Sequence, residues 1–406
     1  NFDGHSFFAD AVSKGAGAII VTEGAVASSS FDGDLLIVEV ADTLDAYHDL
    51  ARFWRLKIDP YVVAVTGSSG KTTTKEMCAA VFSASRKTHK SRANENNEFG
   101  VPKTILSMPE DTEVLVVELA MRGLGQIAQL AATSLADVGI ITCAGTAHIE
   151  LLGSRKNIAR AKCELLSFLK DDGLAVLGEA NELLLKESQK VYSGELSGFE
   201  PSFLSETSVD SKGTRFSING LEVEFFVCAH GQYQLQDAWC AITAGIRAGL
   251  SAEQVRAGLE QYSQIKGRGN TIVTNSGAMI IDESYNANPD SVKCALSGFV
   301  DRRAYPHARK VAVLGEMAEL GESARELHEE LGDWMKELPL SRLVTVGEMA
   351  SLIADRVEGG AIEVRRCNDL GEAVSVVACE LTADSCIMVK GSNSTRLYDL
   401  VEKLIQ

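Results

Sequence analysis

Residues 62–74 constrain the fold of this chain more than any other stretch. The apolar run 62–65 predicts a buried strand, a glycine-bracketed turn follows it, and residues 75–82 read as a helix. Backbone N–H groups in such a turn point at phosphate oxygens, and a helix N-terminus favours negative charge. The stretch therefore predicts a phosphate-binding loop at the edge of a parallel sheet.

The side chains of this loop suit different parts of a bound nucleotide. Lys71 can reach the terminal phosphates, and the Thr72 hydroxyl is an oxygen ligand of the kind that Mg²⁺ prefers. The other loop positions expected to contact phosphate are Gly67, Ser68, Ser69, Gly70 and Thr73.

Composition narrows the classes of partner and the compartment. The net charge of −17, with no block of Lys or Arg to offset it, argues against nucleic acid or an anionic membrane surface as a partner. No apolar run reaches the roughly 18 residues of a membrane-spanning helix. The nine cysteines show no CxxC spacing and lie mostly in apolar runs, as expected for reduced thiols in the cytoplasm. The chain starts at Asn1 within an apparently structured segment, so we expect further residues before it.

The order of apolar runs predicts a three-domain α/β protein. Near-continuous apolar strands separated by helices indicate parallel sheets covered on both faces. Residues 203–228 alternate like an antiparallel ribbon, and a second α/β series begins at residue 266. The predicted domains are a partial N-terminal domain (1–59), a central nucleotide-binding domain with a parallel sheet (60–265) and a C-terminal Rossmann-like domain (266–406).

Three residues near the predicted sheet edge are candidates for metal binding or reactivity. Glu118 ends the apolar run 114–117, where a carboxylate is a usual Mg²⁺ partner and a solvated glutamate is the alternative. His148 follows the next apolar run, and a ligand role and a structural role fit the sequence equally. Lys162 lies on the apolar stripe of a helix predicted over 157–170. It is either a lysine whose ammonium reaches water or a buried one with a lowered pKa and a reactive neutral amine.

Polar segments elsewhere have less specific interpretations. Asn96 and Asn97, in a polar loop that ends in a rigid turn, either bind a polar ligand or close the loop on itself. Arg268 stands between two glycines and either swings onto a phosphate or marks a hinge. Lys390 begins an exposed polar turn after the last strand. Four side chains between a strand and a helix could bind the nucleotide, with the carboxylates suited to ribose hydroxyls: Asp282, Glu283, Asn286 and Asn288.

Taken together and in this order, the motifs resemble the Mur ligase family over nearly the whole chain. The runs Tyr285-Asn286-Ala287-Asn288-Pro289 and Leu314-Gly315-Glu316-Met317-Ala318-Glu319-Leu320-Gly321 are the most specific. The other matching segments are residues 3–5 with Phe7, 66–72, 96–97 with 100–102, 117–119, 147–148, 153–154, 158–164, 267–269 and 390–392.

This resemblance implies roles for the matched positions. Lys71 and Thr72 would hold the ATP phosphates and one Mg²⁺. A second Mg²⁺ would lie at Glu118, His148 and a carbamylated Lys162. Asn96 and Asn97 would face a muramyl peptide, and Asp282 or Glu283 would bind ribose. The implied catalytic set is Lys71, His148, Lys162 and Arg268.

The resemblance also implies an activity. The expected enzyme is a cytoplasmic, monomeric ligase that joins D-alanyl-D-alanine to UDP-N-acetylmuramoyl-tripeptide through an acyl phosphate, in peptidoglycan precursor synthesis. One alternative is another amide ligase of the superfamily, MurE or folylpolyglutamate synthase. A second alternative is a P-loop nucleotide-binding switch, although a guanine-reading Asn-Lys-x-Asp motif is absent from the sequence.

Overall fold

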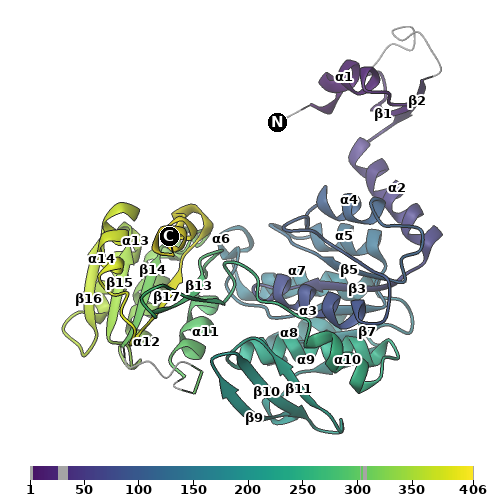
Figure 1. Cartoon of the computed structure of the whole chain (residues 1–406). Coiled ribbons are helices and arrows are strands. Elements are labelled where there is room, and N and C mark those ends of the chain that lie inside the picture. The colour runs from purple at the N-terminus through teal and green to yellow at the C-terminus, as the bar shows by residue number, and fades with distance from the viewer. Residues whose placement is uncertain (1–2, 26–34, 302, 305–308, 406) are drawn as a thin grey trace.

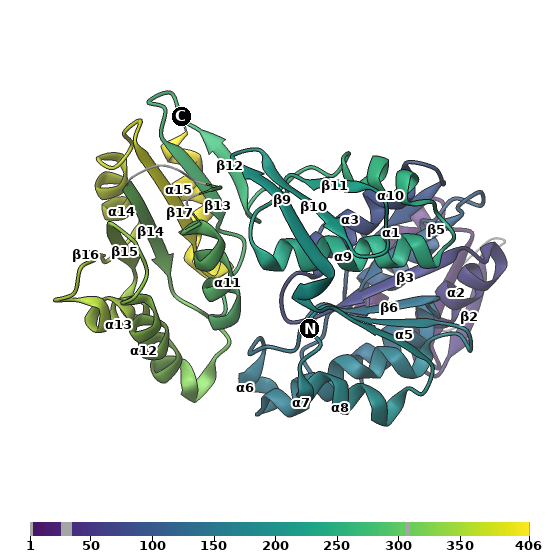
Figure 2. The same cartoon turned by 90° about the horizontal axis from the view of Figure 1, so that it is seen from below.

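The computed structural model describes residues 3–25, 35–301, 303–304 and 309–405. The chain forms two large α/β bodies side by side, with a small N-terminal part projecting from one of them (Figures 1 and 2). This mixed α/β architecture with parallel sheets confirms the predicted fold class. In the described part of the chain, no helix is both long enough and apolar enough to span a bilayer.

The central part is built on a six-stranded, fully parallel sheet. Its four central strands are apolar and buried because helices cover both faces, as the continuous apolar runs predicted, whereas its two edge strands are only partly buried. The strand order is β4 (Thr88–Lys90), β5 (Val114–Glu118), β3 (Tyr61–Thr66), β6 (Val138–Ile141), β7 (Leu174–Leu177) and β8 (Glu195–Gly198).

Alternate residues of these strands face two separate cores. One core packs against α3 (Lys71–Ser83), α9 (Gln232–Arg247) and α10 (Ala252–Leu259). The other packs against α2 (Thr43–Ile58), α4 (Gly100–Leu106), α5 (Gln126–Ser134), α7 (Arg155–Cys163) and α8 (Glu182–Val191).

The predicted antiparallel ribbon is a three-stranded sheet that packs on the first of these cores. It consists of β9 (Leu204–Asp210), β10 (Gly213–Ile218) and β11 (Glu224–Val227), with β10 in the middle. Phe216 and Phe225, directly opposite each other on β10 and β11, are fully buried and have stacked rings with centroids 5.7 Å apart. This aromatic pair anchors the small sheet to the central part.

The C-terminal part contains a second six-stranded sheet, parallel except for its antiparallel edge strand β12. The order is β12 (Asn270–Val273), β13 (Met279–Glu283), β17 (Ser385–Lys390), β14 (Arg309–Gly315), β15 (Arg342–Val346) and β16 (Glu363–Cys367). One face packs on α11 (Pro289–Phe299), α12 (Ala324–Met335) and α13 (Glu348–Val357), and the other on α14 (Leu370–Ala378) and α15 (Leu397–Leu404).

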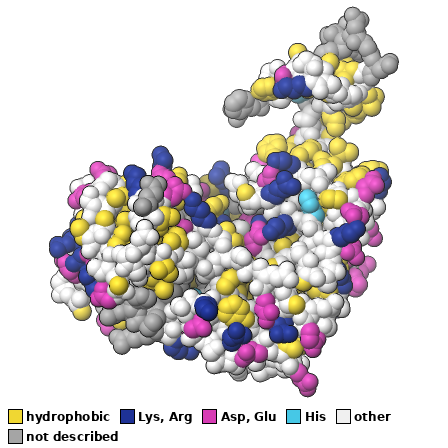
Figure 3. Space-filling model, in the orientation of Figure 1, with side chains coloured by type: hydrophobic (Ala, Val, Ile, Leu, Met, Phe, Trp, Pro, Cys, Tyr) yellow, Lys and Arg dark blue, Asp and Glu magenta, His cyan; other side chains and the backbone are white. Residues whose placement is uncertain are grey.

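The N-terminal part is small and leaves apolar side chains uncovered. It contains α1 (Phe8–Ser13) and a parallel pair of strands, β1 (Ala18–Thr22) and β2 (Leu36–Val40). Figure 3 shows hydrophobic side chains on its surface and at its junction with α2. Its exposed large apolar residues are Phe7, Ile20, Leu36 and Val38. Two strands cannot bury their own apolar faces, which accounts for this exposure.

One predicted helix is wrong in extent. The helix expected over 157–170 ends at Cys163, and a 3₁₀ segment, Glu164–Phe168, follows it. A 3₁₀ segment has fewer residues per turn than an α-helix, so the apolar residues after Cys163 point in other directions than a continued α-helix would give them. Leu165 and Leu166 are nevertheless buried. Lys162 therefore lies in the last turn of a short helix rather than in the middle of a long one.

Candidate active site

The phosphate loop lies between β3 and α3, and two glycines allow its close packing. A Cβ at Gly67 would lie 1.8 Å from Thr142 Oγ1, and one at Gly70, whose φ is +79°, would lie 2.7 Å from Asp237 Oδ1. Lys71 Nζ donates a hydrogen bond to the Gly67 carbonyl at 2.9 Å, so the lysine curls over its own loop. Burial lowers the pKa of Lys71. The loop thus has the shape of a phosphate cradle with one cation at its mouth.

Glu118 reaches the phosphate loop because β5 pairs with β3, which places Glu118 opposite Val65. Its Oε2 accepts a hydrogen bond from Thr72 Oγ1 at 2.9 Å, and its Oε1 accepts one from Asn96 Nδ2 at 2.8 Å. A hydroxyl and a carboxylate this close are oxygen donors that fit Mg²⁺ next to the phosphates. The structure thus brings together Thr72 and Glu118, which lie 46 residues apart in the sequence.

The two asparagines of the polar loop have different surroundings. Asn96 bonds Glu118 and lines the same cavity as the phosphate loop. The Asn97 side-chain oxygen accepts hydrogen bonds from the N–H groups of Gly100 at 2.9 Å and Phe99 at 3.3 Å. Asn97 therefore closes the loop on itself, which was the alternative left open by the sequence, while also lining the cavity.

His148 faces the C-terminal part of the chain. Its Nδ1 lies 2.7 Å from Oε2 of Glu319, which comes from the loop after β14. Burial lowers the pKa of His148, and the Glu319 carboxylate opposes that shift. Nothing local in the sequence marks Glu319 as a partner of His148, because the two residues meet only when the sheets pack.

Lys162 is fully buried, as one of its two sequence interpretations required. Its side chain is 2% exposed, and no carboxylate of the described residues forms an ion pair with it. Burial, followed by repulsion from Lys71, lowers the pKa of Lys162 to about 7. A large share of the Lys162 amine is therefore neutral near neutral pH, which is the state that a reactive lysine requires.

Arg268 belongs to the C-terminal part but lines the same cavity as the phosphate loop. Gly267 and Gly269, on either side, have φ values of +77° and +88°, and the guanidinium stacks over the Tyr285 ring at 4.0 Å. The glycines thus turn the chain so that a cation faces the central part.

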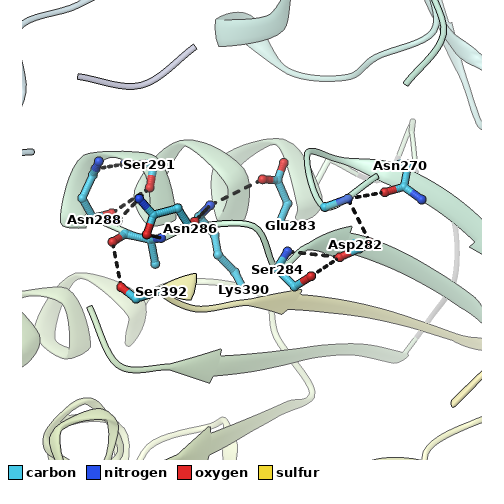
Figure 4. Close-up of polar contacts among 11 residues, drawn as sticks. Asn270, Asp282, Glu283, Ser284, Asn286, Asn288, Ser291, Lys390 and Ser392 are labelled. Atoms are coloured by element: carbon cyan, nitrogen blue, oxygen red, sulfur yellow. Dashed lines mark hydrogen bonds and ion pairs between the residues drawn. The ribbon is translucent and has the colours of Figure 1, made fainter. Parts of the chain in front are cut away.

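Asp282 has a structural use that the sequence did not reveal. It is fully buried and does not line the cavity. Its carboxylate accepts hydrogen bonds from the N–H of Gly267 (3.0 Å) and from the N–H and hydroxyl of Ser284 (3.1 and 2.5 Å; Figure 4). These bonds hold the turn that carries Arg268, so of the two adjacent carboxylates only Glu283 lines the cavity.

Glu283 faces the cavity together with Lys390. Their charged groups are 3.4 Å apart, and Lys390 Nζ also donates to the Asn286 carbonyl at 2.9 Å (Figure 4). Lys390 is 4% exposed and residues 391 and 392 are buried too, so the expectation of an exposed turn is wrong. Asn288 caps α11 by accepting a hydrogen bond from the Ser291 N–H at 2.8 Å.

These groups surround one cavity of about 540 Å³ between the two α/β bodies. Gly67, Lys162 and Asp282 are not among the residues that line it. The predicted residues that line it are Ser68, Ser69, Gly70, Lys71, Thr72, Thr73, Asn96, Asn97, Glu118, His148, Arg268, Glu283, Asn286 and Asn288.

Asp237 is a cavity residue that the sequence analysis missed. It lies on α9 behind the phosphate loop, where Thr74 Oγ1 donates a hydrogen bond to Oδ1 at 2.8 Å. Burial raises the pKa of Asp237 from 3.8 to about 8. The carboxyl group is therefore mostly protonated at neutral pH. The available signal in the sequence was an acidic residue directly before the apolar run 238–242.

Asp237→Asn should stabilise the protein increasingly as the pH rises. The folded wild type keeps a proton that the unfolded chain loses above 3.8, so its free energy of unfolding falls as the pH rises towards about 8. The asparagine side chain does not titrate, so the variant lacks this pH-dependent loss of stability. Urea denaturation of both proteins at pH 5 and pH 8 measures the effect. A difference between them that does not change with pH would contradict the prediction.

Comparisons with known proteins agree with this geometry. The Mur ligase middle domain matches residues 65–245, and the Mur ligase, glutamate ligase domain matches residues 267–393. The UDP-N-acetylmuramoyl-tripeptide–D-alanyl-D-alanine ligase of Bacillus subtilis is 33% identical, over all of this chain and 88% of that protein. The crystal structure of MurF from Acinetobacter baumannii superposes with a TM-score of 0.88 at 28% identity, covering 100% of this chain and 88% of that one.

A second solved structure concerns a nucleotide complex. MurF ligase from Thermotoga maritima in complex with ADP has a TM-score of 0.86 and 27% identity, covering 99% of this chain and 91% of that one. The agreement extends over both α/β bodies and the N-terminal part. Full-length similarity above 30% identity, together with the matched middle and C-terminal domains, shows that this chain belongs to the Mur ligase family.

Proposed function

We propose that this chain is an ATP-dependent ligase that joins D-alanyl-D-alanine to the carboxyl end of UDP-N-acetylmuramoyl-tripeptide, in peptidoglycan precursor synthesis. The observation that carries the proposal is the single cavity in which a phosphate loop faces Arg268 and Glu283 from the C-terminal part. The full-length relative from Bacillus subtilis has this activity in its name, and the relative from Thermotoga maritima binds ADP.

The chemistry requires activation of a carboxylate, which is a poor electrophile at neutral pH. A carboxylate oxygen of the tripeptide attacks the γ-phosphorus of ATP, the bond to the β-phosphate oxygen breaks, and ADP leaves. The amine of D-alanyl-D-alanine then attacks the acyl phosphate, loses a proton, and expels inorganic phosphate through a tetrahedral intermediate. The chain supplies positioning and charge stabilisation and needs no nucleophile of its own.

Each part of the cavity has a task in this scheme. The loop amides and Lys71 hold the transferring phosphoryl group, and Arg268 approaches it from the other side. Mg²⁺ at Thr72 and Glu118 would neutralise phosphate charge. Ribose would bind at Glu283, with Asn286 and Asn288 beside it. The muramyl peptide would lie along the wall that contains Asn96 and Asn97.

A second Mg²⁺ requires more oxygen ligands than the bare side chains offer. Among the described residues, no three His, Cys, Asp or Glu side chains cluster closely enough to hold a metal. Glu118 and His148 are therefore short of a third ligand. A carbamate on Lys162 would supply two more oxygens beside them. For this reason we include carbamylated Lys162 in the proposed site.

The test of the proposed function is phosphate release from ATP in the presence of both substrates. A ligase releases phosphate only when UDP-N-acetylmuramoyl-tripeptide and D-alanyl-D-alanine are both present, and it forms the joined pentapeptide. A P-loop switch hydrolyses nucleotide without either. Replacing the dipeptide with a free amino acid, or the UDP-peptide with a folate, separates this activity from MurE and folylpolyglutamate synthase. The proposed enzyme is monomeric and cytoplasmic, and light scattering tests the first of these properties.

Binding of ATP should draw the two α/β bodies together. Arg268 and Glu283 lie on the C-terminal part, and their contacts with a nucleotide on the phosphate loop would stabilise the compact arrangement and exclude water from the acyl phosphate. We expect the radius of gyration from solution scattering to fall when a non-hydrolysable ATP analogue and the UDP-tripeptide are added. An identical radius with and without these ligands would count against closure.

A further inference from the structure

Asp290, in the first turn of α11, directs its carboxylate to the central part of the chain. Oδ2 accepts hydrogen bonds from the N–H and the hydroxyl of Thr146, both at 2.7 Å. Oδ1 accepts one from Arg155 Nη2, also at 2.7 Å. Both oxygens are thus bonded by donors from the other α/β body, and one partner is charged.

The Asp290 carboxylate can approach the central part because residue 145 there is a glycine, which has no side chain. A Cβ there would lie 2.4 Å from Asp290 Oδ2 and 3.0 Å from Asp290 Cγ, and the three nearest atoms it would meet all belong to Asp290. The backbone of Gly145 is not in the left-handed region, so alanine is compatible with its own loop. The glycine at this position therefore serves the contact between the two bodies rather than the local turn.

The position of Arg155 is electrostatically unfavourable for its own helix, α7. Arg155 is the first residue of α7, and a cation at a helix N-terminus opposes the helix dipole. Asp290 occupies the favourable place for an acid, in the first turn of α11. Arg155 thus weakens its own helix, and its ion pair with Asp290 on the other body compensates for that loss.

We propose that Gly145, Thr146, Arg155 and Asp290 form an interface latch, which holds the two bodies in the arrangement that completes the cavity. Thr146 lies two residues before His148 on the central side. On the other side, Asn286 and Asn288 in the cavity wall directly precede Asp290. Figures 1 and 2 show α11 on the side of the C-terminal sheet that faces the central part. The latch thus fixes the two cavity walls relative to each other, and Asp290 is a positioning residue.

The consequence for turnover rests on the proposed function. A misplacement of about 1 Å can slow a reaction about 10²-fold, so we expect Asp290→Ala and Gly145→Ala each to lower kcat/KM by roughly 10- to 100-fold. Most of the loss should fall on kcat. Arg155→Ala should lower kcat/KM by only about 2- to 5-fold, because that side chain is more than half exposed. The double variant Gly145→Ala/Asp290→Ala should be no worse than either single variant, since both remove the same contact.

A second measurement tests the latch without turnover. Hydrogen–deuterium exchange, recorded with a non-hydrolysable ATP analogue present so that the two bodies are together, reports on the loop and helix at residues 145–160. We expect faster exchange there in Asp290→Ala and Gly145→Ala than in the wild type, with unchanged exchange in the strands of both sheets. The matched controls are Gly123→Ala, where a Cβ meets nothing within 4 Å, and Arg325→Ala, which removes an exposed pair within α12. Neither control should alter exchange or turnover.

The outcomes separate the two proposals. If the wild type forms no pentapeptide, the proposed function fails, and the exchange data still decide on the latch. If the wild type turns over but the Asp290 and Gly145 variants exchange and react as it does, the latch is wrong. A loss in the double variant equal to the product of the single losses would also overturn it. Lower melting temperatures with unchanged kcat and exchange would assign these residues to stability alone.

Discussion

Lys71→Ala should abolish ligation while leaving the fold intact. Lys71 is the cation of the phosphate loop, and its ammonium now rests on the Gly67 carbonyl, 2.9 Å away. When a nucleotide is bound, this ammonium would contact the phosphates instead. It would then stabilise the negative charge that develops on the transferring phosphoryl group. Loss of one such group lowers kcat by about 10²–10³-fold, and we expect at least that here.

Phosphate release and product formation by the purified variant measure this effect. The control is Lys87→Ala, which removes an exposed lysine from an ion pair with Asp111 far from the cavity wall. The variant Lys71→Ala should melt at or slightly above the wild-type temperature, because burial disfavours the charged amine. Turnover near that of the wild type in the folded variant would contradict the assigned role.

Lys162 should be carbamylated in the active enzyme, and Lys162→Ala should lose most of the activity. With a pKa near 7, the amine is largely neutral at pH 8. The nitrogen then attacks the carbon of CO₂ and loses a proton, which leaves a carbamate anion. Such an anion is unfavourable in a buried site by itself, but it suits a site with Glu118, His148 and Mg²⁺. The modification exchanges a buried cation for a metal-binding oxygen group.

The modification can be observed without measuring activity. Adding ¹³C-labelled bicarbonate and Mg²⁺ to the wild type should give a carbamate carbon signal by NMR, which Lys162→Ala lacks. Its intensity should rise between pH 6 and pH 8 as the amine loses its proton. Lys156→Ala, at an exposed lysine of the same helix, is the control and should keep the signal. An absent signal in the wild type, with a rate that bicarbonate depletion leaves unchanged, would refute the prediction.

Much of the central part could be predicted from short stretches of sequence. The apolar runs 62–65, 114–119, 138–142 and 174–177 predicted β3, β5, β6 and β7, because central strands of a parallel sheet are buried on both faces. Three of the four edge strands of the two large sheets, β4, β8 and β12, were missed. They are short and only partly buried, so they lack the apolar pattern that identifies a central strand.

Some site residues could be predicted from local sequence order, whereas the roles of others depend on packing. The phosphate loop, Thr72 and Glu118 follow from the strand–loop–helix order and from the rule that parallel strands end at one edge. The sequence did not distinguish Asp282 from Glu283. The two are adjacent on β13, so their side chains point to opposite faces. Only packing decided that Asp282 binds the turn at Gly267 and that Glu283 faces the cavity.

The sequence by itself determined the phosphate loop, the parallel α/β class and the family, because those signals lie within stretches of a few to a few tens of residues. The tertiary structure alone decided which charged groups are buried and which meet across the two bodies. Lys162 is buried in the packed structure, and its lowered pKa follows from that burial and from repulsion by Lys71, 91 residues earlier in the chain. Asp290 meets Thr146 across 144 residues of chain. Such contacts depend on how two complete sheets pack together, and no local pattern encodes that.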